Sequence, residues 1–106
     1  MIGYVTLGTN DLPRAAAFYD AIASEMGVGR MMDFETFIAW GAPGGGAGVA
    51  ATKPHDGNTA SVGNGVTIGF EAPDRASVDR FHATALAHGG TDEGAPGLRP
   101  HYHPNY

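Results

Sequence analysis

The side chains of this sequence best suited to chemistry are His101 and His103, which stand two positions apart near the end of the chain. In a β-strand, residues at that spacing point to the same face. Two such imidazoles could bind zinc, or one of them could transfer a proton near neutral pH. Pro104 interrupts the stretch, and no Asp or Glu stands nearby to complete a ligand set. We therefore interpret both histidines as pocket-lining or surface residues.

Four further side chains could contact a small molecule. The phenol of Tyr4 could donate a hydrogen bond or act as an acid. The ring of Trp40 could stack on a planar ligand. Arg30 and Arg99 could pair with an anionic group. The alternative for each residue is an ordinary structural role, as a packed aromatic or as a surface cation.

The composition limits the classes of function. The chain has 106 residues, 42% of them hydrophobic, which is enough for one domain and too few for two independent cores. A net charge of -5 and six scattered Lys and Arg residues argue against nucleic acid or an anionic membrane as partner. There is no cysteine, which excludes thiolate chemistry. The N-terminal stretch lacks the features of a secretory leader, so we expect a cytoplasmic protein.

Short strands and helices must position the candidate side chains. Residues 2–9 alternate as a strand, with Val5 and Leu7 on one face and Tyr4 on the other. Residues 10–27 have a helical pattern, because Asp11 can cap the start and Gly27 can follow the end. Three further strands are predicted at residues 29–35, 36–41 and 47–53.

The sequence also repeats itself weakly at a shift of 63 positions. The shift aligns the residues that define the helix: Asp11 with Asp74, Phe18 with Phe81, and Gly27 with Gly90. We therefore predict a second strand and helix after Asn64, with the helix capped by Asp74. The first unit covers about residues 1–63 and the second covers residues 64–106. A complete second unit would run to about residue 126, so we expect its last strands to be missing, most simply through truncation.

The stretch from Asp11 to Tyr19, "D-L-x-R-A-x-x-F-Y", placed after a strand in a repeated unit, resembles the vicinal oxygen chelate superfamily. This superfamily contains glyoxalases, bleomycin-resistance proteins and extradiol dioxygenases. The resemblance implies one α+β domain, residues 1–106, in which two βαβββ units form a half-open β-barrel with the helices outside. It also implies a small-molecule pocket inside the barrel and a homodimer.

Enzymes of this superfamily usually hold a divalent metal through His and Glu on the inner face of the strands. By the resemblance, the readable ligand positions fall on Tyr4, Thr67 and a site at or near Ala50. A phenol, a hydroxyl and a methyl group do not make a standard metal site. We therefore expect no metal cofactor, with a divalent metal as the alternative.

These considerations predict a protein that encloses a small organic molecule without the standard metal site. The expected pocket is lined by Tyr4, Arg30, Trp40, Thr67, Arg99, His101 and His103. The alternative is a lyase, isomerase or dioxygenase of the same superfamily that uses an atypical metal site or Tyr and His acid-base groups.

Overall fold

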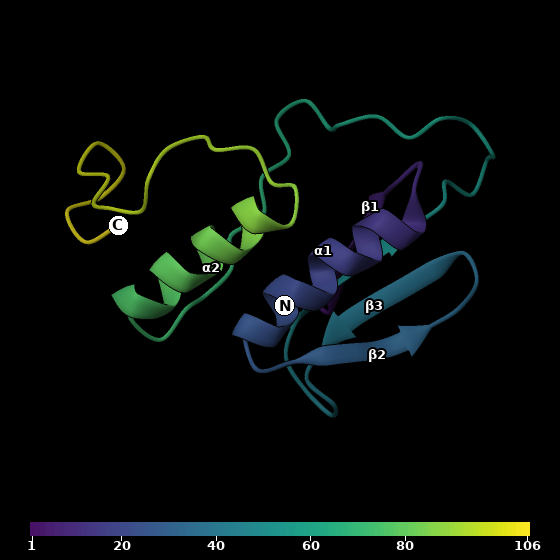
Figure 1. Ribbon diagram of the computed structural model, residues 1–106, viewed down its shortest axis with the longest axis horizontal. Coiled ribbons are helices and arrows are strands. Elements are labelled where there is room, and N and C mark those ends of the chain that lie inside the picture. The colour runs from purple at the N-terminus through teal and green to yellow at the C-terminus, as the bar shows by residue number, and fades with distance from the viewer.

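The computed structural model describes residues 1–106 and contains one four-stranded sheet and two helices (Figure 1). The elements, in chain order, are β1 (Tyr4–Gly8), α1 (Leu12–Glu25), β2 (Gly29–Asp33), β3 (Phe37–Gly41), β4 (Gly48–Thr52) and α2 (Arg75–Ala87). The predicted order of strand, helix and three strands in the first unit is confirmed, as is the helix of the second unit.

The strands of the sheet lie in the order β1-β4-β3-β2. β1 and β4 are parallel, whereas β2, β3 and β4 form an antiparallel meander. In this register Tyr4 lies opposite Gly48, and Ala50 lies between Thr6 and Ala39. A β-bulge interrupts the pairing of β2 with β3 between Arg30 and Met32.

The start and end of α1 follow the predicted signals. The carboxylate of Asp11 accepts a hydrogen bond of 3.1 Å from the backbone N–H of Arg14. This bond satisfies one of the donors left free in the first helical turn. Gly27 follows the helix with a φ of 72°, a conformation that side chains other than glycine disfavour. α2 begins in the same way, because Asp74 caps the N–H of Ser77.

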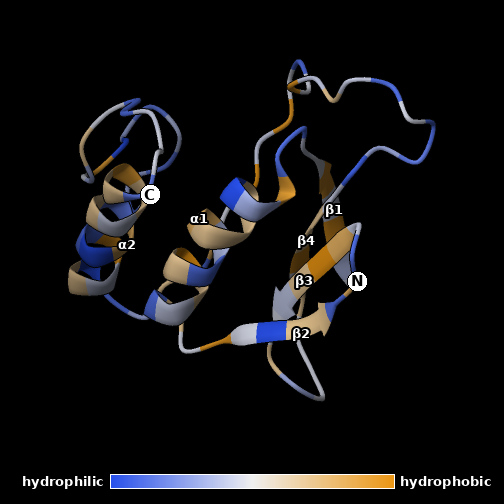
Figure 2. Cartoon of the chain, turned by 45° about the vertical axis from the view of Figure 1, so that its right-hand side comes forward, coloured by the Kyte–Doolittle hydropathy of each residue, from blue (hydrophilic) through white to orange (hydrophobic).

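The core lies between α1 and one face of the sheet. Its buried members are Leu12, Ala16 and Ala23 from the helix and Ile38, Trp40, Val49 and Ala51 from the strands. Both helices lie on the same side of the sheet, and no helix covers the other side (Figure 2). Met26 lies outside this core: it follows the last residue of the helix, Glu25, and its side chain is 39% exposed.

The strand predicted after Asn64 is not formed, which corrects the expectation for the second unit. A strand needs a hydrogen-bonded neighbour, and the neighbour of β1 is β4. Residues 66–70 pair with no strand of the sheet and are irregular, while the α+β class with an open sheet is confirmed.

Polar contacts at both ends of α1 attach the second half of the chain to the first. The side-chain amide of Asn10 donates to the carbonyl of Ala60 at 3.0 Å and accepts from its N–H at 2.7 Å. At the other end of α1, the hydroxyl of Thr84 donates to Glu25 at 3.0 Å. α2 therefore packs beside α1, and the face of the sheet opposite α1 stays free.

Candidate functional site

The face of the sheet opposite α1, here called the open face, is the candidate functional site. Val5 and Leu7 pack against the core beneath α1. Successive side chains of a strand alternate between faces, so Tyr4 and Thr6 point to the open face. Tyr4 is 63% exposed, and its hydroxyl makes no hydrogen bond within the chain. The phenol is thus free to bond with a ligand.

Small residues occupy the centre of the open face. Pairing with β1 places Gly48 and Ala50 beside Tyr4 and Thr6, and Ala39 follows on the next strand. Gly41 lies two residues further along β3, and therefore on the same face as Ala39. The alanines are almost completely buried, at 0% for Ala50 and 4% for Ala39. Together these four residues, Ala39, Gly41, Gly48 and Ala50, form a flat floor with little side-chain relief.

The bulge in β2 places two consecutive methionines at the far edge of this floor. Arg30 pairs with Trp40, whereas Met32 pairs with Ala39, so Met31 is the extra residue of the bulge. Met32 shares the face of its partner Ala39, and the sulfur of Met31 lies against Gly41 and Gly48. Both methionines are about half exposed, at 47% and 45%. Sequence analysis missed them, since their common orientation depends on the bulge.

Two of the predicted pocket residues lie on the opposite side of the sheet. Trp40 is 1% exposed and packs against Tyr19 of α1, with ring centroids 5.1 Å apart. Its indole N–H donates to the carboxylate of Asp20 at 2.7 Å. Trp40 therefore belongs to the core, and its assignment to the pocket is wrong.

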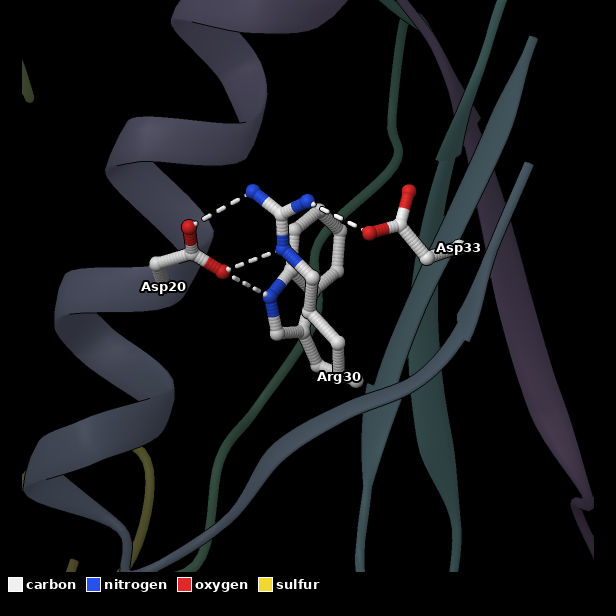
Figure 3. Close-up of polar contacts among 4 residues, drawn as sticks. Asp20, Arg30 and Asp33 are labelled. Atoms are coloured by element: carbon white, nitrogen blue, oxygen red, sulfur yellow. Dashed lines mark hydrogen bonds and ion pairs between the residues drawn. The ribbon is translucent and has the colours of Figure 1, made fainter. Parts of the chain in front are cut away.

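Arg30, the strand neighbour of Trp40, is held in the same polar network (Figure 3). Its guanidinium donates two hydrogen bonds to Asp20, at 2.9 and 2.8 Å, and one to Asp33 at 2.9 Å. These bonds join β2 to α1 and use three of the five N–H groups of the guanidinium, whose charge is already paired with two carboxylates. Arg30 lies on the helix side of the sheet because it pairs with Trp40, and paired residues share a face.

Hydrogen bonding also changes the acidity of this network. The bonds from Arg30, with a smaller contribution from Trp40, hold the pKa of the Asp20 carboxyl below its ordinary value of 3.8, although partial burial opposes the change. The bonds to Asp20 and Asp33 raise the pKa of Arg30. Asp20 and Arg30 therefore remain a charged pair at neutral pH.

The remaining predicted residues lie outside the sheet: Thr67, His101 and His103 are exposed, and Arg99 is partly buried. The chain after Gly97 folds into turns in which Tyr102 and His103 donate backbone hydrogen bonds to Arg99. The strand expected here is not formed. This terminal segment lies beside α2, away from β1, in both ribbon views (Figures 1 and 2). The structure therefore does not bring the histidines together with Tyr4.

The metal positions implied by the resemblance can be tested against this geometry. Tyr4 and Ala50 do share the open face, on neighbouring strands, but Thr67 lies in an irregular segment. No group of three His, Asp or Glu side chains in residues 1–106 is close enough to hold a metal ion. The donor set on the open face consists of hydroxyls and thioethers, which does not fit a divalent metal with His and Glu ligands.

An apolar cavity of about 580 Å³ lies on the helix side of the sheet. It is bounded by α1, α2 and the irregular segment after Ala60, and Phe18, Phe70 and Phe81 contribute its aromatic lining. None of the predicted pocket residues lines it. The only sequence signal for it is the alignment of Phe18 with Phe81 in the repeat.

Neither helix of the structure is long and apolar enough to cross a membrane.

Comparisons with known proteins agree with the fold. The family model for the glyoxalase/bleomycin resistance protein/dioxygenase superfamily matches residues 1–103. A crystal structure of a glyoxalase/bleomycin resistance protein from Albidiferax ferrireducens T118 is similar, with 35% sequence identity and a TM-score of 0.84. The match covers 93% of this chain and 79% of that chain. A search of curated proteins found no significant match.

Proposed function

The chain belongs to the glyoxalase/bleomycin resistance protein/dioxygenase superfamily, and from this premise we propose that it binds a small organic molecule on the open face of its sheet. The observation that carries the proposal is the flat floor of Ala39, Gly41, Gly48 and Ala50 beside the free hydroxyl of Tyr4. The floor residues have no large side chains of their own, so a ligand can lie against the backbone once Met31, whose sulfur lies against Gly41 and Gly48, moves aside. Tyr4 then supplies the hydrogen bond that orients the ligand.

The proposed binding does not use a metal at the positions that the superfamily employs. Tyr4, Ala50 and Thr67 occupy those positions, and a methyl group cannot coordinate an ion. The enzymatic alternative with Tyr and His acid-base groups is less well supported. His101 and His103 lie in the terminal turns beside α2, whereas an acid and a base must both reach the same substrate.

Blocking the floor is expected to abolish binding. Gly41→Val places a branched side chain where Met31 now lies, since a Cβ at this position would be 2.8 Å from its sulfur. The nearest backbone atom is 3.5 Å away, so the fold can accommodate the change when Met31 moves. We expect affinity for any open-face ligand to fall at least about tenfold, equivalent to ~1.4 kcal/mol.

The measurement is a screen of neutral organic fragments against the 15N-labelled chain. Amide signals of β1, β3 and β4 are expected to shift in the original protein and to stay unchanged in Gly41→Val. The matched control is Gly45→Val, which makes the same substitution in the loop after β3, where no atom lies within 4 Å. Fragments that still shift these amides in Gly41→Val would place the binding site elsewhere.

The superfamily resemblance also supports a homodimer, which we propose on that basis alone. We propose the cytoplasm as its compartment. Sedimentation equilibrium of the purified chain is expected to give twice the mass of 10.9 kDa. A monomer at all accessible concentrations would reject the dimer, and the distribution of a fluorescent fusion tests the compartment.

A further inference from the structure

The side chain of Met31 lies across the floor of the open face. A Cβ built on Gly41 would be 2.8 Å from the Met31 sulfur, and one built on Gly48 would be 3.4 Å from it. The same point at Gly48 is 3.8 Å from the Cβ of Tyr4. Met31 therefore reaches from β2 over β3 to Gly48 of β4, the residue that pairs with Tyr4. Glycine at position 41 allows this close approach, whereas a Cβ at position 48 would contact the sulfur at an ordinary distance and would lie 2.9 Å from the carbonyl oxygen of Trp40.

Methionine is well suited to such a position. Its unbranched side chain has three rotatable bonds, so it can move aside at little cost in energy. Its thioether also makes favourable contacts with aromatic rings. The bulge places Met32 next to it on the same face, so two thioethers border the floor opposite Tyr4. A ligand that replaces Met31 on the floor would contact both.

The chemistry of the surrounding groups restricts the ligand. The strands place no charged side chain on the open face, because Arg30 is paired with Asp20 beneath α1. The floor is flat and apolar, and it offers van der Waals contact to a flat molecule. The polar groups at its edge are the hydroxyls of Tyr4 and Thr6. An ionic ligand would lose its hydration here without gaining a counter-charge.

We propose that the open face binds a flat, uncharged aromatic ring carrying a hydroxyl or carbonyl group, which displaces Met31 from the glycines and contacts the thioethers of Met31 and Met32. The polar group of the ligand bonds to the Tyr4 hydroxyl. The inference rests on the proposed function, since it names the ligand class of the same face.

The four methionines of the chain allow a direct test. The full chain is labelled with 13C at the methionine methyl groups and titrated with 2-naphthol. The saturated analogue decahydro-2-naphthol serves as the matched ligand without a ring current. We expect 2-naphthol to shift the methyl signals of Met31 and Met32 upfield. Met26 lines a separate cavity between α1 and α2, so its signal is expected to stay in place.

Substitution of the thioethers gives a second, quantitative readout. Met32→Leu keeps an apolar side chain of similar size and removes the sulfur. We expect it to weaken 2-naphthol binding between about twofold and tenfold. Met26→Leu is the matched control, because it makes the same change away from the open face, and it is expected to leave the affinity unchanged.

Three results would overturn the proposal. Equal affinity for decahydro-2-naphthol would reject the aromatic preference while leaving the open face as a binding site. A shift confined to Met26 would move the site to the helix cavity and would reject the proposed function as well. If no methyl signal moves with 2-naphthol, the ligand class is rejected, and the fragment screen on Gly41→Val decides the proposed function separately.

Discussion

Replacing Trp40 with alanine is expected to unfold the chain at room temperature. The side chain is 1% exposed, packs against Tyr19, and is the largest fully buried side chain of the protein. Truncating a buried Trp to Ala usually costs about 3 to 5 kcal/mol, since transfer energy is lost and a cavity remains. Only 12 of the 106 residues are buried, so the core has little surplus stability to absorb such a loss.

The measurement is far-UV circular dichroism during urea denaturation, because Trp40 is the single tryptophan and its removal eliminates the fluorescence signal. Trp40→Phe is the informative companion variant. It keeps an aromatic ring in the core and removes the N–H that binds Asp20, so it should lose less stability than the alanine variant. If Trp40→Ala retains a cooperative transition with an unchanged midpoint, the core described above is wrong.

Asp20→Ala is expected to produce the second-largest effect on stability. The carboxylate of Asp20 accepts the N–H of buried Trp40 and two hydrogen bonds from Arg30. Removing it leaves the indole N–H without a partner, and an unsatisfied buried donor costs about 1 to 3 kcal/mol. The ion pair adds little to this figure, because the side chains of Asp20 and Arg30 are 44% and 36% exposed and solvent screens their charges.

The same network predicts a dependence of stability on pH. The folded protein holds the pKa of Asp20 below 3.8, its ordinary value. A carboxyl with a lowered pKa in the folded state stabilises the fold fully above the unfolded pKa. This contribution disappears as the pH falls through the folded pKa, because Asp20 is then protonated in both states. The acid sensitivity due to Asp20 should therefore lie below about pH 5 and be absent from Asp20→Ala.

Asp33→Ala is the matched control for this prediction. Asp33 contacts Arg30 only, with a side chain that is 60% exposed, and makes no bond to Trp40. Urea denaturation at pH 7 should show a large loss for Asp20→Ala and a small one for Asp33→Ala, and the loss for Asp20→Ala should be smaller at about pH 3. Equal losses in the two variants would show that the bond to Trp40 contributes nothing measurable.

Both helices and their ends could be predicted from the sequence. The signals that define them are local: Asp11 and Asp74 each cap a donor three residues ahead, and Gly27 ends α1 within the next turn. The strands of the first unit were also predicted, because their alternation and the glycines between them are local patterns. The superfamily could be identified from the residues between Asp11 and Tyr19.

The faces of the strands could not be predicted in the same way. Trp40 and Arg30 were assigned to the pocket, yet both point toward α1. Met31 and Met32 were overlooked, although both lie on the open face. In each case the outcome depends on the register of β2 with β3 and on the bulge between Arg30 and Met32. Register belongs to a pair of strands, so a single stretch of sequence carries little information about it.

The sequence by itself determined the fold class, the two helices and the superfamily, because helical hydrogen bonds and caps involve residues a few positions apart. The tertiary structure alone decided that residues 66–70 form no strand and that the floor beside Tyr4 consists of small residues crossed by the side chain of Met31. A strand forms and presents its side chains only with a neighbour, and that neighbour lies far away in the chain.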